Sequence, residues 1–417
     1  MNNRSFTLIE LLVVIAIVGI LSGIVLMSSS GAVNSAQNAR IKNDIDSLRK
    51  VILSYKAYYR LAPIEDPACN IGSDCSQLAS DLLAIDPNIS FPTNPSGGYY
   101  RYYSANGTTF TITADLPNSR TLVYDFQNGY SEYASLAGYT KRKSITISSS
   151  ASLTDYQVKV DVTYDSDMLS SFDDLRFTLS NGTTELNYWT ESVSAGVSAV
   201  VWVKVPSLAI GDNTIYMYYG NASASTASNG DNTFELFDHF EGSSLDANKW
   251  TAYDSSNGIS ISNSILTISG ASSIQRGIYS ILTFGINTVN RYYSKYNTYQ
   301  ASGYCNVSGN RYTQIVKGTS GLEKTVSYIS NETNTSITIP ETVYATYEIK
   351  RNNTSSIIYI INNSIVSTHV TQIPTESINI QYYIYNSSTD TYIDWVLVRQ
   401  YTATEPSISS WGTEESI

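Results

Sequence analysis

The pattern of hydrophobic positions divides the chain into a helical first part and a much longer β-rich part. Residues 6–27 carry one charge, and apolar side chains then recur every three or four positions, which predicts an amphipathic helix. This stripe comprises Ile41, Ile45, Leu48, Ile52, Tyr55 and Tyr59. We therefore expect one helix over residues 6–60. At 1.5 Å per residue its apolar run is about 33 Å long, enough to cross a bilayer.

The remainder of the chain shows short alternating runs bounded by turn residues, which predict antiparallel β-structure. Asn106-Gly107 marks a hairpin turn, and alternating valines mark half-buried strands further on, at Val158, Val160 and Val162. The expected fold class is α+β and mostly β, with a long N-terminal helix, a small antiparallel sheet and two β-sandwich domains. We place their boundaries at residues 61–138, 139–237 and 238–417.

Composition excludes one large class of partners. Charged residues are 15% of the 417, and the formal net charge is −11. A protein that coats nucleic acid needs clustered Lys and Arg, so we expect no specific nucleic-acid partner. The chain has 34 Tyr against 10 Phe, and such polar, β-prone composition is typical of exported β-proteins.

The cysteines point to an oxidising compartment. Cys69 and Cys75 lie close together in "CNIGSDC", whereas Cys305 stands far away. The chain has two histidines, His239 and His369, and neither neighbours the pair, which disfavours a zinc site. We expect a disulfide between Cys69 and Cys75 and an unpaired Cys305.

Glu10 is the one charge inside the apolar run. A carboxylate at membrane depth costs roughly 2.5 to 3.5 kcal/mol, so it should have a partner. A secretory signal peptide cut near Gly31 conflicts with the length of the run and with this charge. A plain membrane anchor leaves the carboxylate without a partner, and the third interpretation makes it half of an assembly contact. Arg4 predicts a cytoplasmic N-terminus, with the bulk of the chain outside.

The segment "RSFTLIELLVVIAIVGIL" resembles the class III leader and N-terminal helix of bacterial type IV pilins and pseudopilins. The match covers Arg4, the Ser5-Phe6 junction, Thr7, Glu10 and the apolar run. The resemblance implies that a membrane prepilin peptidase removes residues 1–5 and N-methylates Phe6. It also implies that Glu10 compensates the N-terminal amine of a neighbouring subunit as helices pack into a filament, because the two charges cost far less in lipid as a pair.

Two positions depart from that family. Ser5 stands where the family usually has Gly before the cut, and Met27 stands where many members have Pro. Gly19 and Gly23 still weaken the helix, so partial unwinding in a filament stays open. The resemblance extends, by arrangement, to a small pilin globular domain over residues 61–138.

The segment from Asp155 to Val193 and the one from Val201 to Ala224 resemble a surface domain of unknown function in exported bacterial and archaeal proteins. The matching positions are Asp174, Arg176, Phe177, Trp189, Trp202, Tyr219, Gly220 and Asn221. This resemblance implies a β-sandwich over residues 139–237 and no particular chemistry.

The segments "FDHFEGSSLDANKW" and "YIDWVLVRQYTATEPSISSWGTEE" resemble the opening and closing strands of a concanavalin A-like jelly roll. That fold hosts both glucan hydrolases and sugar-binding lectins, so the fold alone decides nothing. The hydrolases usually carry their two carboxylates in an E-x-D-x-x-E pattern, and no E-x-D triplet occurs in this sequence. We therefore expect a binding domain and no enzyme.

Two groups of residues are candidate sites, each with a plainer structural explanation. One is a tyrosine group that stacks on sugars or fills strands; its members are Tyr292, Tyr293, Tyr296, Tyr299 and Tyr304. The other is an acidic group that chelates calcium or forms a solvated loop; its members are Asp165, Asp167, Asp173 and Asp174. Apart from this calcium candidate, we expect no cofactor.

The sequence thus predicts a type IV pilin-like structural subunit with an adhesive role. It would enter the cytoplasmic membrane first and then an extracellular filament, or pilus, on the cell surface. Its partners would be copies of itself or other pilins, the prepilin peptidase and surface glycans. A pseudopilin of a type II secretion or DNA-uptake machine is the alternative, and a surface glycoside hydrolase comes third.

Overall fold

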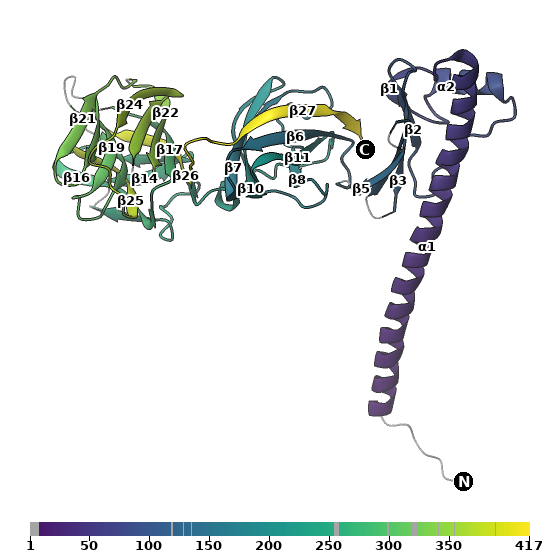
Figure 1. The fold of residues 1–417 in the computed structure, drawn as a ribbon. Coiled ribbons are helices and arrows are strands. Elements are labelled where there is room, and N and C mark those ends of the chain that lie inside the picture. Colours follow the sequence, from purple (N-terminus) through teal and green to yellow (C-terminus); the bar gives the residue numbers. More distant parts are fainter. Residues whose placement is uncertain are drawn as a thin grey trace, which may run out of the picture.

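The structure is a computed structural model. It describes residues 8–117, 120–127, 129–134, 136–253, 258–297, 300–318, 323–340, 342–353, 355–387 and 389–417. Side chains are described from Val33 onward, apart from positions 67, 131–134, 271–273, 386 and 387. The chain forms a helix with a small sheet at one end, followed by two β-globules in a row (Figure 1).

Helix α1 runs from Leu8 to Tyr59, and its 52 residues make it about 78 Å long. Its last third packs on a sheet through the predicted stripe, in which Ile41, Ile45, Leu48 and Ile52 are at most 2% exposed. Among residues with described side chains, no helix is long and apolar enough to span a membrane. The apolar run predicted to span, residues 6–27, lies outside those residues.

The sheet against α1 is antiparallel, with strand order β1-β2-β3-β4-β5. Its elements are β1 (Glu65–Asn70), α2 (Ser76–Ile85), β2 (Tyr100–Ser104), β3 (Thr111–Leu116), β4 (Arg120–Asp125) and β5 (Gly129–Ala134). Two hydroxyls tie it to the helix, because Tyr100 donates to Asp44 at 2.7 Å and Tyr130 to Asp46 at 2.8 Å. A disulfide joins Cys69 and Cys75 between β1 and α2.

The loop at Asn106-Gly107 is longer than a two-residue hairpin, since β2 ends at Ser104 and β3 begins at Thr111. Gly107 has φ +72°, and a Cβ there would lie 2.7 Å from the carbonyl oxygen of Ala62. Only glycine fits this backbone and this close approach. The Gly107 carbonyl accepts a hydrogen bond from Lys56 Nζ at 2.8 Å, which fixes the loop to the end of α1.

The middle globule is a sandwich of two small antiparallel sheets, β7-β10-β9 and β27-β6-β11-β8. Its strands are β6 (Lys141–Ser149), β7 (Leu153–Thr163), β8 (Arg176–Leu179), β9 (Tyr188–Ser194), β10 (Ser198–Leu208), β11 (Gly211–Tyr219) and β27 (Ser407–Ser416). The valines at 158, 160 and 162 are at most 1% exposed and face its core. Their alternation on β7 therefore marks the inner face of the sandwich.

The last strand departs from the sequence analysis, which ran the jelly roll to residue 417. Strand β27 pairs with β6 of the middle sandwich, from Ser407 opposite Ser148 to Ser416 opposite Lys141. The jelly roll is thus an insertion between β11 and β27. The resemblance to a jelly roll did not specify the partner of β27. In the structure Glu414 and Glu415 lie opposite Lys143 and Arg142 of β6, so charge complementarity supports this pairing.

The third globule consists of two large antiparallel sheets packed on a common core. One has the order β14-β15-β26-β17-β22-β23-β24 with β12 beside β26, and the other has β13-β16-β25-β18-β19-β20-β21. After the short helix α3 (Gly230–Thr233), the strands are β12 (Leu236–Asp238), β13 (Trp250–Tyr253), β14 (Ile259–Ser262), β15 (Ile265–Ile268), β16 (Ala271–Phe284), β17 (Thr288–Lys295), β18 (Gln300–Cys305), β19 (Tyr312–Lys317), β20 (Glu323–Tyr328), β21 (Glu332–Ser336), β22 (Tyr344–Asn352), β23 (Ser356–Ile361), β24 (Ser364–His369), β25 (Ile378–Ser387) and β26 (Thr391–Gln400).

A separate hydrophobic cluster, the aromatic joint, connects the middle sandwich to the jelly roll. It consists of Trp189, Trp202, Phe234, Phe237, Trp395 and Leu397. The rings of Trp189 and Trp395, one from each globule, meet edge to face with centroids 5.3 Å apart. Such contacts remove large aromatic surfaces from water, so the two globules are packed on each other and not merely linked.

Buried charges surround the aromatic joint and are paired across it. Arg291 of β17 is 4% exposed and forms ion pairs with Glu191 of β9 and Glu348 of β22. Glu191 also accepts a hydrogen bond from the indole of Trp202 at 2.6 Å. Removing one partner of such a buried set leaves an uncompensated charge, which is strongly destabilising.

A second charge set holds the strand connection that leaves the jelly roll. Glu405 accepts hydrogen bonds from Arg399 at 2.6 Å and Lys350 at 2.7 Å, and from Tyr156 of β7 at 3.3 Å. Burial acts to raise the pKa of Glu405, but Arg399 and Lys350 outweigh it and lower that pKa to about 2. The carboxylate therefore stays ionised at the joint under almost all conditions.

This shift predicts a pH dependence of stability. Glu405 has an ordinary pKa of 4.5 in the unfolded chain, so its contribution is complete above that pH and is lost as pH falls towards about 2. The loss amounts to about 3 kcal/mol. In thermal unfolding from neutral pH to about pH 2.5, Glu405→Gln should be less stable at neutral pH and should lose less on acidification.

Glu185→Gln is the matched control, because Glu185 is 59% exposed and 3.9 Å from its nearest cation, Arg176. We expect its unfolding profile to follow that of the wild type. Parallel profiles for wild type and Glu405→Gln across the whole range would show that the Glu405 set does not stabilise the joint.

Candidate binding face and the acidic cluster

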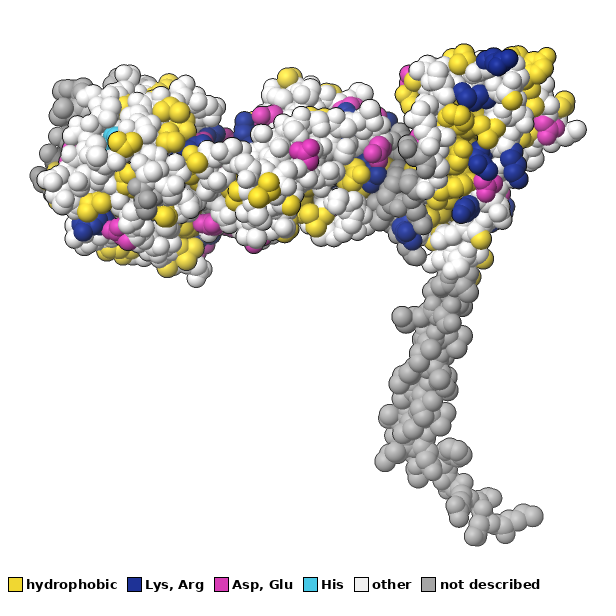
Figure 2. Space-filling model, in the orientation of Figure 1, with side chains coloured by type: hydrophobic (Ala, Val, Ile, Leu, Met, Phe, Trp, Pro, Cys, Tyr) yellow, Lys and Arg dark blue, Asp and Glu magenta, His cyan; other side chains and the backbone are white. Residues whose placement is uncertain are grey.

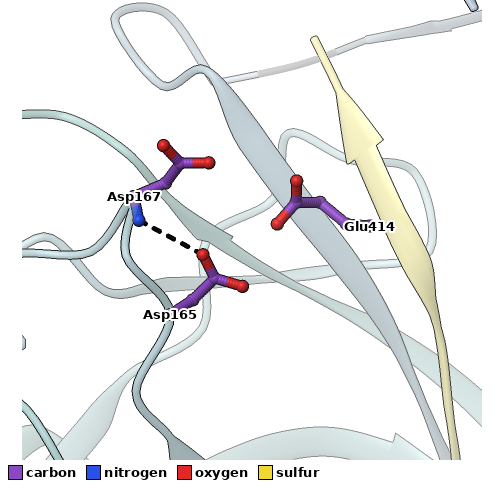
Figure 3. Close-up of side chains that lie close together, drawn as sticks. All are labelled: Asp165, Asp167 and Glu414. Carbon is purple, nitrogen blue, oxygen red and sulfur yellow. Dashed lines mark hydrogen bonds between the residues drawn. The ribbon is translucent and has the colours of Figure 1, made fainter. Parts of the chain in front are cut away.

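Two of the four candidate calcium ligands, Asp165 and Asp167, lie close together, but each is paired with a lysine. One carboxylate oxygen from each of Asp165, Asp167 and Glu414 lies within 4.8 Å of the other two (Figure 3). Glu414 comes from β27, almost 250 residues further along the chain, so sequence spacing gave no sign of it. Lys143 Nζ lies 3.0 Å from Asp165, and Lys141 Nζ lies 3.2 Å from Asp167 and 2.7 Å from Glu414.

The ammonium groups occupy the position that a cation would take. Partial burial acts to raise the pKa of Asp165, yet its hydrogen bond with Lys143 holds that pKa below its usual value. Burial likewise acts to lower the pKa of Lys141, but Glu414 and Asp167 raise it. Calcium needs six to eight oxygen ligands, and this cluster offers three carboxylates already compensated by two ammonium groups.

The other two acidic candidates point elsewhere. Asp174 is fully buried and accepts backbone hydrogen bonds from Leu169 at 3.0 Å and Gly220 at 2.8 Å. Asp173 accepts a hydrogen bond from the Ser171 hydroxyl at 2.7 Å. Asp174 therefore fixes the end of β11 to the loop before β8, which is a structural role.

Of the two explanations for the tyrosines singled out from the sequence, the described members fit the second, because they pack within the globule and form no sugar-binding surface. Tyr292, Tyr296 and Tyr304 are 0% exposed and belong to the jelly-roll core. Tyr293 is on the opposite side of β17 and stacks on Trp395 at the aromatic joint, with ring centroids 6.0 Å apart. Tyr299 lies outside the described residues.

A different set of tyrosines lines the solvent side of the seven-stranded sheet, here called the tyrosine face. Strand pairing places on it Tyr253, Gln275, Tyr279, Tyr312, Gln314, Tyr328, Gln381, Tyr383 and Tyr385. Figure 2 shows dispersed hydrophobic patches and few charges on the visible face of this globule. The period-two alternation of residues 382–385 separates the two sides of β25 but does not say which side is inner.

The tyrosine face points away from the rest of the molecule. Val396 and Val398 of β26 belong to the jelly-roll core, so Trp395, Leu397 and Arg399 point to the other side of their sheet. That side is the one packed against the middle sandwich through the aromatic joint. The seven-stranded sheet covers the opposite side of the core, and its outer surface is therefore distal.

The tyrosine face combines flat rings with amide groups. Tyr312 and Tyr328 stack at 5.1 Å with an angle of 8° between their planes. Tyr385 is 52% exposed and, with Tyr383, lines a hollow of about 400 Å³ at one end of the face. Burial raises the pKa of both Tyr312 and Tyr383 to about 12, so their hydroxyls stay neutral and can both donate and accept hydrogen bonds.

Two polar atoms beneath this face are buried without a hydrogen bond of ordinary geometry. Gln314 is 3% exposed, and its Nε2 has no hydrogen-bond partner among the described residues; neither has the Tyr253 hydroxyl. A buried donor without a partner costs about 1 to 3 kcal/mol, and such groups require an explanation. Gly277 leaves room for the Tyr253 hydroxyl, since a Cβ there would lie 2.6 Å from it.

Carboxylates are scarce on this face. Strand pairing places Glu332 of β21 on the tyrosine face, opposite Tyr328. Its Oε1 lies 2.7 Å from Lys324 Nζ. Retaining glycoside hydrolysis needs two carboxyl groups about 5 Å apart, one of them free to protonate the leaving group. Glu332 is one such carboxylate, and it is already paired with an ammonium group.

The structure does not describe the side chains of the residues proposed for processing and assembly. Ser5 and Phe6 lie outside the described residues, and Glu10 is in α1 without a described side chain. Their identification rests on sequence. The prokaryotic N-terminal methylation motif matches residues 1–26, so the chain carries the leader of prepilin peptidase substrates. This motif indicates membrane anchoring and transfer of the chain to the cell surface.

A second match, to the domain of unknown function DUF2341, covers residues 171–253. It runs from the loop before β8 through α3 into β13 of the jelly roll. The match therefore includes four members of the aromatic joint, which are Trp189, Trp202, Phe234 and Phe237. Comparison with curated proteins gave no match.

Several solved structures are similar to the jelly-roll part. A beta-glucanase of Bacillus licheniformis is 15% identical, with a TM-score of 0.34 over 40% of this chain and 97% of that one. A pseudo beta-1,3-glucanase and immunostimulatory antigen of Mycobacterium tuberculosis is 14% identical, with a TM-score of 0.34 over 40% and 98%. A structure from work on endo-acting O-glycanases of the human gut microbiota is 13% identical, with a TM-score of 0.32 over 40% and 99%. At these values the similarity carries no argument about activity.

The acidic cluster predicts indifference to calcium. Millimolar calcium should leave the unfolding temperature of the wild-type protein unchanged, because Lys141 and Lys143 already compensate the carboxylates. The double variant Lys141→Met and Lys143→Met should be less stable, and calcium should restore part of that loss. A rise of several degrees in the wild type on adding calcium would show that the cluster is a metal site.

Proposed function

We propose that this chain is a type IV pilin-like subunit that assembles into an extracellular filament and presents a binding domain at its distal end. The observation that carries the proposal is the N-terminal methylation motif at residues 1–26, most of which lies in the first half of the long helix α1. A small antiparallel sheet packs on the last third of that helix, as a pilin globular domain would. The two further globules then extend outward from this base.

Assembly in this proposal depends on Glu10. After cleavage before Phe6, the new N-terminal ammonium and the Glu10 carboxylate of a neighbouring subunit would compensate each other in an apolar environment. Each charge alone is costly there, and the pair sets the axial register of one helix on the next. The same charge in a plain anchor would have no such partner.

Binding in this proposal takes place on the tyrosine face, and the ligand class is surface glycan. Sugar rings present apolar C–H faces edged by hydroxyls, which suits flat tyrosine rings interspersed with amides. Gln275 is exposed and Gln381 is partly exposed among these rings, so their amide groups can hydrogen-bond to sugar hydroxyls. With Glu332 bound to Lys324 and no E-x-D triplet in the chain, the domain is proposed to bind glycan without cleaving it.

If Glu10 acts in assembly, its substitution should reduce the number of filaments without reducing the amount of protein in the membrane. Glu10→Gln keeps the side-chain shape but removes the charge, so the protein should be processed and should reach the membrane in normal amount. Filaments should be few or absent in cells that lack the native subunit, because each subunit would bury an unpaired ammonium. Filament counting by electron microscopy and immunoblots of membrane fractions give the two readouts.

Glu10→Asp is the matched control, since it keeps the charge on a shorter side chain and should restore filaments in part. Filaments of Glu10→Gln at wild-type number and length would refute the assembly role. If wild-type cells form no filaments and deletion of the gene causes a secretion defect, the pseudopilin alternative would be favoured.

The binding role predicts a loss localised to one face. Tyr385→Ala and Tyr312→Ala should each weaken retention on a glycan array by up to roughly tenfold, the value of one aromatic contact. Tyr103→Ala is the control, because Tyr103 is 39% exposed but lies on the small sheet near the helix. Unchanged binding in both face variants would place the ligand elsewhere, and release of reducing sugar by the wild type would support a hydrolase.

A further inference from the structure

Strands β6 and β27 of the middle sandwich are connected to the small sheet and to the jelly roll, respectively, at opposite ends of their ladder. Strand β6 begins at Lys141, next to the small sheet, and β27 begins at Ser407, next to the jelly roll (Figure 1). They are antiparallel, with Ser416 opposite Lys141 and Ser407 opposite Ser148. A pull between base and jelly roll therefore acts on the two ends of the ladder that lie furthest apart.

The direction of this pull decides how the ladder is loaded. Hydrogen bonds of an antiparallel ladder are perpendicular to the strands. When opposed forces act along the strands from opposite ends, the rungs share the load and must break nearly together. When both forces act at the same end, the rungs break one after another at low force. Forced unfolding is governed by the barrier to rupture, so the geometry matters more than the equilibrium stability.

The other connection to the jelly roll is protected from peeling. Strand β11 ends at Tyr219 beside Lys141, so a pull on the following segment would act at the weak end of the β6–β11 ladder. That segment is bound along its length to the middle sandwich. Gly220 N donates to Asp174 at 2.8 Å, Arg176 donates to the Ser225 carbonyl at 2.8 Å, and Asn229 N donates to the Tyr188 carbonyl at 2.8 Å.

Side chains reinforce the ladder near its base end. Glu414 of β27 binds Lys141 at 2.7 Å and also accepts a hydrogen bond from the Tyr219 hydroxyl. Glu415 binds Arg142 at 2.6 Å. These contacts join β27 to both β6 and β11, so the three strands would have to slip together. At the other end, Glu405 holds the connection that enters β27 to Arg399 and Lys350.

We infer that the β6–β27 ladder is a mechanical clamp, which carries tension between the membrane-anchored base and the distal jelly roll in shear. The C-terminal strand supplies this property because it returns past the whole jelly roll to the first strand of the sandwich. The inference goes beyond the proposed function and needs neither filament assembly nor glycan binding. Its failure in isolated molecules would leave both of those proposals untouched.

Single-molecule force spectroscopy on the full chain tests the clamp by pulling the same ladder in two directions. One arm is pulled from the N-terminus and a thiol introduced by Val307→Cys in the jelly roll, where Val307 is 64% exposed. The other arm is pulled from the N-terminus and the C-terminus, which lies beside Lys141. The native Cys305 is buried and Cys69 and Cys75 are joined, so the new thiol is selective.

Contour-length increments identify which globule opens. We expect β27 to peel from β6 at low force in the second arm. In the first arm, the middle sandwich should resist a force several-fold higher, or outlast the jelly roll altogether. Opening of the middle sandwich at the same force in both arms would overturn the inference.

Discussion

The pairing of β27 with β6 is the constraint on which the outer two thirds of the molecule depend. It closes the four-stranded sheet of the middle sandwich with the last ten-residue strand of the chain. Because that strand comes after the jelly roll in sequence, the chain leaves the middle sandwich after β11 and returns to it at β27, and the jelly roll is held by two connections. A globule held by two connections has far fewer orientations available than one held by a single linker.

The buried joint follows from this double connection. With the jelly roll held close, its outer sheet surface can bury the aromatic joint against the middle sandwich. Arg291 and Arg399 are desolvated there, and each has carboxylate partners: Glu191 and Glu348 for the first, Glu405 for the second. Buried ion pairs of this kind add little net stability compared with apolar contacts, but a mismatched orientation would leave charges uncompensated. They therefore specify one relative placement, with the tyrosine face directed away from the base.

The sequence predicts elements better than partners, and particular residues show why. The stripe from Ile41 to Ile52 packs as expected, because a helical period defines one face of a known helix. Strand alternation is equally clear, yet it does not tell the inner side of a strand from the outer side. For Tyr292 and Tyr296 it therefore left two explanations open, a sugar-binding surface or strand packing, and the structure shows that they fill the core. The partner of β27, the approach of Glu414 to Asp165 and the ion pairs of Arg291 are all contacts between distant segments. No local pattern encodes them.

The most direct test of this account is hydrogen exchange, followed by mass spectrometry, on the full chain and on a variant that lacks residues 407–417. The account predicts that the deletion abolishes protection in β6, β7 and β11 of the middle sandwich, because β6 loses one of its two neighbours and becomes the edge strand of its sheet. Protection in the jelly-roll strands β17, β22 and β25 should remain, since their core contains nothing from β27. Loss of protection in the jelly roll with an intact middle sandwich would contradict the account.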